Sequence, residues 1–405
     1  MEAGTTPSHS AGPQAIGYLH QARYALLRIL ESDEPEKTSV MIEGLDDVEV
    51  QGQNGVVELD QLKHHISEKA SLTDKSPDLW KTIKVWSDYF TSNRNEADSL
   101  SLNLVTTAEA PDESAASVLR EESSQDIEEV DQLLLDAAET SKNGSLEDAF
   151  ESYKDISKKD RKNILKSITV YDESYTIEEA SERIKRILLY SVDKKYLDNA
   201  FSRLEGWWFD RVVRQIIGRK NTLIQGASVI SKLHSIADQF RAENLPIDFS
   251  NTYLDPGDRE EYESRMFVKQ LEVVAANAAR VKNAIIDFYR AFQQRSKWVS
   301  EDLVFDNELE KYERKLIEEW ERRKAAYEDE VDKESSEKEL KELGRKILRW
   351  VELEADIPIR PKVEEKYVVR GSYHMLADEK PPRVHWHPEF QNRVEEILSD
   401  TAVEA

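Results

Sequence analysis

The stretch EGLDDVEV at residues 43–50, with VVELDQLKH following at 56–64, decides how the first part of this chain folds. Both runs have β-strand composition, and they flank the pair Asn54-Gly55. A type I′ hairpin turn needs positive φ at both central residues, which Asn and Gly tolerate. The sequence therefore predicts a β-hairpin here.

This hairpin would bring carboxylate, amide and ammonium groups together. Residues two apart in a strand share a face, so Gln61 and Lys63 project together, and antiparallel pairing places them near Asp46 or Asp47. With a two-residue loop, Asp46 lies opposite Lys63. One bulge or a three-residue loop brings Asp47 opposite Gln61 instead. Both registers stay open at this point.

Such a constellation can hold a metal ion and a water molecule. Hard divalent cations such as Mg²⁺ or Mn²⁺ prefer oxygen ligands, which Asp46, Asp47 and the side-chain carbonyl of Gln61 supply. A bound metal lowers the pKa of its water, and a lysine beside it stabilises developing negative charge. The expected reaction is hydrolysis of a phosphodiester. A plainer interpretation makes Asp46-Asp47 a polar turn and Lys63 a solvated strand end.

An acid before one strand and Gln-x-Lys on the next resemble the PD-(D/E)xK nucleases, in the variant where Gln replaces the second acid. More narrowly, four segments are similar to the double-stranded-DNA endonuclease domain of bacterial antiphage effectors, first known from CBASS systems. They are GYLHQ (17–21), IEGLDDV (42–48), QLKH (61–64) and LWKT (79–82). The resemblance covers roughly the first 170 residues. It implies an α/β restriction-endonuclease-like fold and a Mg²⁺ or Mn²⁺ cofactor.

The same resemblance ranks the candidate residues. An acid directly before a hydrophobic strand favours Asp47 over Asp46 as the principal metal ligand, beside Gln61, with Lys63 catalytic. Glu43 is a further ligand or a group that supports one. Gln21 is a candidate site residue or a surface glutamine. Of His64 and His65, which face opposite ways in a strand, at most one can reach the site, and neither is assigned to it.

The C-terminal third carries a second resemblance. The segments DFYRAF (287–292), QRSKW (294–298), EEW (318–320) and GSYHMLAD (371–378) resemble the C-terminal domain of effectors in ABC-three-component antiphage systems, which include Lamassu. In that family this helical domain follows a variable effector domain and docks onto an SMC-like ABC-type ATPase and a small third subunit. The resemblance implies a nuclease held inactive by the ATPase until foreign DNA is sensed. It is then released to cut double-stranded DNA as a homo-oligomer, expected to be a tetramer.

Composition limits the other function classes. A net charge of −25 and a pI near 4.9 argue against a chain that holds nucleic acid by itself on a broad basic surface. The sequence contains no cysteine, which excludes disulfides, thiolate metal sites and a cysteine nucleophile. No apolar run approaches the roughly 18 residues of a membrane span, and the N-terminus lacks a signal-peptide pattern. We therefore expect a cytoplasmic protein of a bacterial cell, without membrane association.

These features predict an α/β endonuclease domain over residues 1–172, a helical connecting region over 173–245 and a mainly α-helical docking domain over 246–405. In the last of these, Tyr289, Arg290, Arg295 and Trp298 resemble interface anchors. His385 and His387 are interpreted as packing or partner-contact residues rather than a metal site. Two alternatives remain, a catalytically inactive scaffold or adaptor, and a stand-alone restriction-like nuclease that binds DNA tightly by itself.

Overall fold

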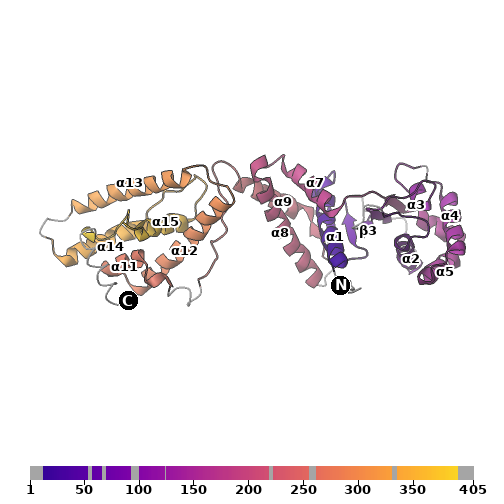
Figure 1. Ribbon diagram of the computed structural model, residues 1–405, viewed down its shortest axis with the longest axis horizontal. Coiled ribbons are helices and arrows are strands. Elements are labelled where there is room, and N and C mark those ends of the chain that lie inside the picture. The colour runs from indigo at the N-terminus through magenta and orange to yellow at the C-terminus, as the bar shows by residue number, and fades with distance from the viewer. Residues whose placement is uncertain are drawn as a thin grey trace, which may run out of the picture. The chain divides into compact units, whose positions relative to one another are not determined.

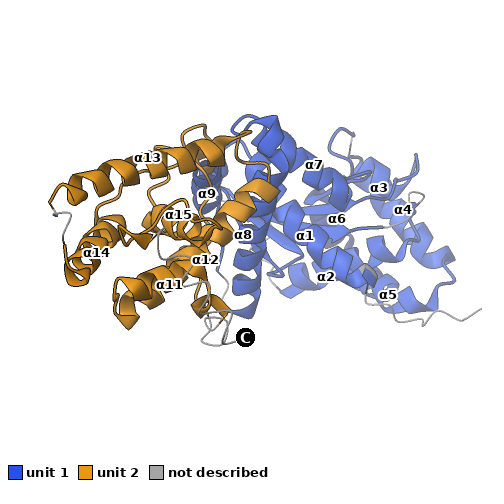
Figure 2. Ribbon diagram, turned by 60° about the vertical axis from the view of Figure 1, so that its left-hand side comes forward, with its two compact units in different colours: residues 1–237 blue, residues 238–405 orange. Residues whose placement is uncertain are grey.

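The chain folds into two compact units, residues 1–237 and 238–405 (Figure 2). The structure, a computed structural model, describes residues 12–52, 57–65, 70–92, 100–123, 125–218, 222–254, 261–330 and 335–390. Unit 1 mixes helices with a sheet, whereas unit 2 is built from helices (Figure 1). This arrangement confirms the predicted order of an α/β region followed by a mainly helical region.

Unit 1 alternates short strands with helices. Its strands are β1 (Ser39–Ile42), β2 (Val48–Gln51), β3 (Val57–Lys63), β4 (Leu100–Thr106), β5 (Ile168–Tyr171) and β6 (Ile224–Gln225). Its helices are α1 (Gly12–Glu31), α2 (Pro77–Ser92), α3 (Ala115–Val118), α4 (Ile127–Thr140), α5 (Glu147–Asp155), α6 (Lys158–Lys166), α7 (Ile177–Leu188), α8 (Leu197–Ile217) and α9 (Gly226–Gln239), with a short 3-10 helix η1 (Pro35–Lys37). The predicted three-part division of the chain stays a prediction; α7 and α8, from its connecting region, belong to unit 1.

Within the described residues, six strands form one mixed sheet in the order β5-β4-β3-β2-β1-β6. The β1, β2 and β3 strands pair antiparallel, and β3, β4 and β5 pair parallel. In the β2–β3 ladder, Val48 pairs with Asp60. Continuing this register past the ladder end puts Asp47 opposite Gln61, the second of the two registers considered above. The turn residues Asn54-Gly55 lie outside the described residues.

Two helices cover opposite faces of β3. Leu59 joins the hydrophobic core that contains Trp86 of α2. The next residue, Asp60, is fully buried on the α1 side, where it accepts a hydrogen bond from Tyr24 (3.0 Å). Side chains alternate along a strand, so Gln61 and Lys63 share the α2 face with Leu59. The end of β3 thus presents its polar residues beside the start of β2.

Unit 2 packs its helices around a separate hydrophobic core. They are α11 (Met266–Val273), α12 (Ala278–Ser300), α13 (Glu308–Glu328), α14 (Glu337–Leu353) and α15 (Lys366–Asp378). The helices α12 and α15 approach closely at Gly371, where an added Cβ would lie 2.1 Å from the carbonyl oxygen of Asp287. Glycine therefore sets the spacing of this helix pair.

The prediction of interface anchors is wrong for Trp298 and Arg295, which are buried inside unit 2. Trp298 is fully buried and donates a hydrogen bond to the carbonyl of Pro246 (2.7 Å). Arg295 is 6% exposed and pairs with Glu313. Both side chains are packed inside the unit: the aromatic ring buries a large apolar area, and the carboxylate partner offsets the cost of burying the arginine charge. His385 and His387 are also buried, as the packing interpretation expects.

Candidate active site

The turn between β1 and β2, residues 43–47, positions the adjacent acids. The Glu43 amide donates to the Asp47 carbonyl (3.0 Å), and Glu43 adopts the left-handed conformation (φ 55°). At Gly44 a Cβ would lie 2.6 Å from the methyl end of the flexible Met41 side chain, which a larger residue would have to displace. The β2 strand starts at Val48, directly after the two adjacent acids, so Asp46 and Asp47 lie at its entrance.

Asp47 and Gln61 meet across the strand ends. The Gln61 amide nitrogen donates to Asp47 Oδ2, and the Leu62 backbone amide donates to the same oxygen (2.7 Å). These two donors fix the Asp47 carboxylate against β3. Of the two adjacent acids, Asp47 is thus the one in direct contact with the Gln-x-Lys strand.

Asp46 is held on its other side by α2. Trp86 Nε1 donates to Asp46 Oδ2 (2.7 Å), and the Asp47 amide donates to Asp46 Oδ1 (2.9 Å). Burial raises the pKa of Asp46 to about 6, although these two donors and the positive charge of Lys63 oppose the rise. Both oxygens of Asp46 already have donors, so this carboxylate acts as a support for the Asp47 backbone.

Glu43 adds a third carboxylate to the edge. Burial raises its pKa, the negative charge of Asp47 raises it further, and a hydrogen bond from Gln21 lowers it. Gln21 comes from α1 and is 9% exposed, so it is not a surface glutamine. Its Oε1 has no hydrogen-bond partner among the residues that the structure describes.

The two histidines after β3 point to different neighbours. His65 pairs with Asp78 at the start of α2 (Nε2–Oδ2 2.9 Å). His64 packs against His20 of α1, with ring centroids 4.7 Å apart. They face opposite ways, as the alternation in a strand predicts.

The structure therefore gathers all six predicted site residues at the edge of the sheet where β3 ends and β2 begins. Gln21 contacts Glu43, Glu43 lies within electrostatic reach of Asp47, Asp47 contacts Gln61, and Lys63 lies near Asp46. The spacing of Leu79, Ile83, Trp86 and Phe90 predicts that Trp86 is a core aromatic, and its hydrogen bond to Asp46 has no separate signal in the sequence. In the described residues no group of three or more His, Cys, Asp or Glu side chains is arranged to hold a metal ion. The predicted metal ligands, Asp46, Asp47 and Gln61, comprise two carboxylates and one amide.

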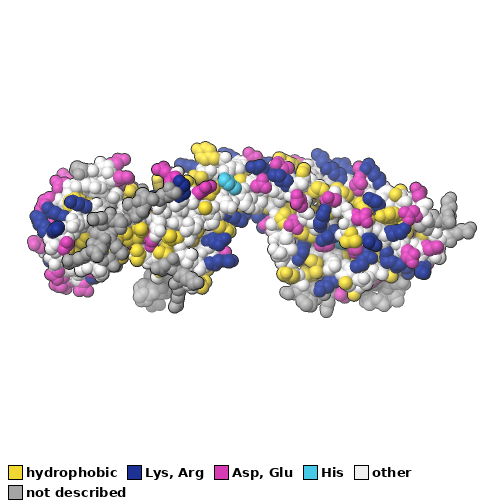
Figure 3. Space-filling view, turned by 180° about the vertical axis from the view of Figure 1, so that it is seen from behind, with side chains coloured by type: hydrophobic (Ala, Val, Ile, Leu, Met, Phe, Trp, Pro, Cys, Tyr) yellow, Lys and Arg dark blue, Asp and Glu magenta, His cyan; other side chains and the backbone are white. Residues whose placement is uncertain are grey.

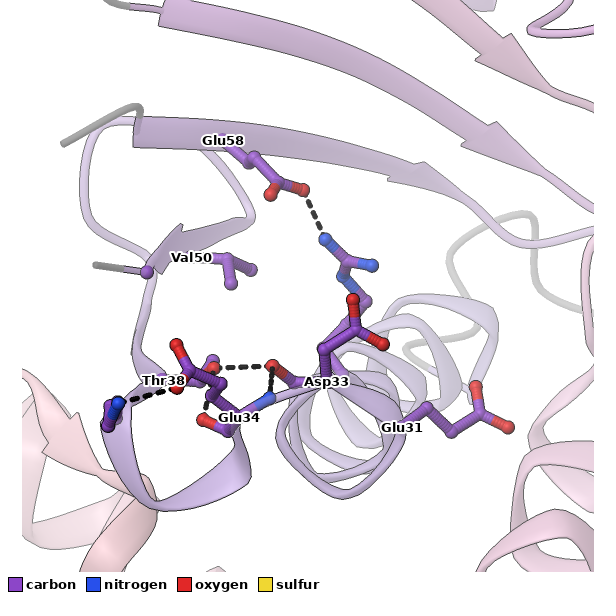
Figure 4. A pocket seen from close by; sticks show the side chains of 10 residues that line it. Glu31, Asp33, Glu34, Thr38, Val50 and Glu58 are labelled. Carbon is purple, nitrogen blue, oxygen red and sulfur yellow. Dashed lines mark hydrogen bonds and ion pairs between the residues drawn. The ribbon is translucent and has the colours of Figure 1, made fainter. Parts of the chain in front are cut away.

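Unit 1 has a cavity where α1 ends. A cavity of about 390 Å³ is lined by residues of the α1 end, η1, β2 and β3, and it contains none of the six candidates (Figure 4). Glu58 pairs there with Arg28, and Glu34 pairs with Lys37. Its charges are partly neutralised internally, which makes it a weaker candidate site.

Charged side chains are mixed over the surface. The face in Figure 3 shows Lys and Arg interleaved with Asp and Glu rather than gathered into one basic area. This distribution agrees with the acidic composition. Over the part of the chain that the structure describes, no helix is long and apolar enough to cross a lipid bilayer.

The C-terminal unit matches a known family model. Residues 267–394 match C-terminal domain 7 of the ABC-three component (ABC-3C) systems. The match supports the assignment of this chain as a component of an ABC-3C system. Such a domain suggests a place in an antiphage defence complex. Because these systems involve multiple components, partner subunits are consistent with the match.

Comparisons over the rest of the chain are weaker. No curated protein matches the sequence. One similar solved structure is the Cap4 SAVED/CARF-domain containing receptor of Moraxella osloensis, at 15% sequence identity over 68% of this chain and 68% of that chain. Its TM-score is 0.31, and at that value the likeness carries no argument.

Proposed function

We propose that this chain is a metal-dependent double-stranded DNA endonuclease, the effector subunit of an antiphage defence complex. The observation that carries the proposal is the contact between Asp47 and Gln61, beside Lys63 and Glu43. These groups come from a tight turn and a separate strand, and a merely solvated turn would not need the two converging donors on Asp47.

The donors at this edge fit a hard divalent cation. Asp47, Glu43 and the amide of Gln61 offer only oxygen atoms to a metal, as Mg²⁺ and Mn²⁺ prefer. Burial raises the pKa of Glu43 and the negative charge of Asp47 raises it further, so a cation beside both carboxylates would stabilise their charged forms. Turning the Gln61 amide about its last torsion, which is soft, would direct its carbonyl oxygen toward the ion.

Each side chain then has a distinct task. A bound Mg²⁺ or Mn²⁺ would supply a water of lowered pKa and polarise the scissile phosphate. Lys63 lies on the same strand face as Gln61 and offers a positive charge to the phosphate oxygens as negative charge develops. Asp46 fixes the Asp47 backbone through its hydrogen bond, and Gln21 orients Glu43.

Restraint by partners would suit this surface. An acidic chain with interleaved charges attracts DNA weakly on its own, so assembly can control access to the substrate. In the proposal, unit 2 docks onto an SMC-like ATPase and a small third subunit, which keep the nuclease inactive. Release on sensing foreign DNA allows the chain to form its active homo-oligomer.

The test is cleavage of linear and supercoiled double-stranded DNA with Mg²⁺ or Mn²⁺. We expect Lys63→Ala and Asp47→Asn each to lower the rate by at least about a hundredfold, because the first removes the positive charge beside the reacting phosphate and the second weakens a carboxylate ligand of the metal. Lys142→Ala is the matched control, since Lys142 is an exposed residue of unit 1 away from the site.

The outcomes separate the alternatives. If Lys63→Ala and Lys142→Ala cut equally well, the site assignment is wrong. If the wild-type chain alone is silent, the assay is repeated with the co-expressed ATPase and third subunit. Silence of that complex on foreign DNA would favour the inactive scaffold, whereas tight DNA binding by the isolated chain would favour a stand-alone nuclease.

A further inference from the structure

His20 and His64 form an imidazole pair that the nuclease proposal does not use. His20 lies on α1 and is 2% exposed, and His64 follows directly after β3. Their ring centroids are 4.7 Å apart, and the planes are tilted by 45°. The pair lies on the α1 side of β3, the face opposite to Gln61 and Lys63.

The hydrogen bond of His20 fixes its tautomer. His20 Nε2 lies 2.9 Å from the backbone carbonyl oxygen of Tyr175. A carbonyl only accepts, so Nε2 carries the proton and Nδ1 of the neutral ring presents a lone pair. Within the described ranges, this buried Nδ1 has no hydrogen-bond partner.

His64 offers a second nitrogen of the same kind. Its Nε2 is buried and likewise lacks a partner in the portion of the chain described. Burial lowers the pKa of His20 to about 4 and also lowers that of His64, so both rings are neutral at pH 7. Neutral imidazole is the form that binds metals.

From this geometry we propose that His20 Nδ1 and His64 Nε2 bind one divalent transition-metal ion of the Zn²⁺ class. Zn–N bonds of about 2.0–2.1 Å at a tetrahedral angle put the centroids of two ligating imidazoles roughly 5 Å apart, close to the observed spacing. The bond from His20 Nε2 to a backbone carbonyl is the outer contact that metal-binding histidines usually make.

The charges around the pair agree with a cation. Glu178, on the exposed first turn of α7, is near enough to act electrostatically on both rings. Arg23 opposes it at His20, but Arg23 is paired with Glu205. A third ligand is not preassembled among the described residues, so water or a rotated Glu178 completes the coordination.

Such an ion would join three separate segments. It would tie α1 to the end of β3 and, through the carbonyl of Tyr175, to the residues before α7. Lys63 immediately precedes His64, so the ion would also fix the strand end that carries the candidate catalytic lysine. The ion site itself does not depend on nuclease activity.

The test is Zn²⁺ binding to the full chain, stripped of metal with a chelator, by calorimetry. In excess Mg²⁺, which competes for the carboxylates around Asp47, we expect one Zn²⁺ site in the wild type and at least about tenfold weaker binding in His20→Asn and His64→Asn, since each removes a ligand. His234→Asn, at an exposed histidine of α9, is the matched control and should bind like wild type. Asp47→Asn should also retain the site, because its carboxylate serves the other face.

A direct measurement guards against variants that fail to fold. The sequence has eight histidines, and Zn²⁺ should shift the ring nitrogen signals of His20 Nδ1 and His64 Nε2 in the NMR spectrum of the wild type. Absence of Zn²⁺ binding to the wild type would overturn the proposal. Binding by both histidine variants that equals wild-type binding would also overturn it. So would loss of binding only in Asp47→Asn, which would place the ion at the carboxylate edge.

Discussion

The charge of Asp46 should weaken the fold of unit 1 at neutral pH. Its pKa rises from 3.8 to about 6 because burial disfavours the charged carboxylate by more than the hydrogen bond from Trp86 favours it. At about 1.4 kcal/mol per pKa unit this corresponds to about 3 kcal/mol, and its partial exposure reduces the expected effect to about 1–3 kcal/mol. The folded state binds this proton more tightly than the unfolded state, so the stabilisation is present below pH 3.8 and is lost as the pH rises through about 6.

The variant Asp46→Asn isolates this effect. Asn cannot ionise, so the free energy of unfolding of Asp46→Asn minus that of wild type should grow by about 1–3 kcal/mol from pH 4 to pH 7. Asn also loses one of the two hydrogen bonds that Asp46 accepts, but that loss is nearly the same at both pH values and cancels.

The measurement is urea unfolding at pH 4 and pH 7, on either side of the pI near 4.9. Unfolding is monitored by hydrogen exchange in peptides of β2 and β3. Following these peptides separates unit 1 from unit 2, since the two units need not unfold together. A difference between variant and wild type that stays within about 0.5 kcal/mol over this range would refute the assigned burial of Asp46.

Three further substitutions test the packing of the units by thermal and urea unfolding. Gly371→Ala should destabilise unit 2 by about 1–3 kcal/mol, because its Cβ would overlap the carbonyl of Asp287; an unchanged melting temperature would contradict this contact. Asp131→Ala should cost about 3–5 kcal/mol by leaving Arg161 buried without its partner, and replacing both residues with Leu should cost less. Trp208→Phe should lower the free energy of unfolding by about 1–3 kcal/mol, because the carbonyl of Ala22 in α1 loses the hydrogen bond from the indole. A change near zero would mean that water replaces the indole as donor.

Local patterns were sufficient to predict the elements that carry the candidate site. Apolar residues at helical spacing after Pro77 are enough to predict α2, and the alternation of Leu100, Leu102 and Leu104 with polar residues is enough to predict β4, because both signals lie within a few residues. The same alternation predicted that Gln61 and Lys63 share a face. The identity of the nuclease fold and the chemistry of the site stay predictions, for which the cleavage assay is the test.

Contacts between distant segments were beyond such patterns. The two-residue strand β6 pairs with β1 across more than 170 positions, and two residues are too few to show a period. Asp60 looks like an ordinary polar residue of an alternating strand, yet it is fully buried between Tyr24, Arg28 and Asn103. Such burial depends on partners that only the fold brings together.

The choice between Asp46 and Asp47 shows why register is the critical unknown. A change of one residue in the β2–β3 pairing decides whether Asp46 lies opposite Lys63 or Asp47 lies opposite Gln61, and the sequence is compatible with either register. The structure pairs Val48 with Asp60, which places Asp47 at Gln61 and leaves Asp46 to Trp86. The two neighbouring carboxylates thereby acquire different surroundings: one accepts two donors from β3, and the other is buried against α2 with a raised pKa. Adjacent identical residues can therefore differ in role solely through the alternation of the strand that they enter.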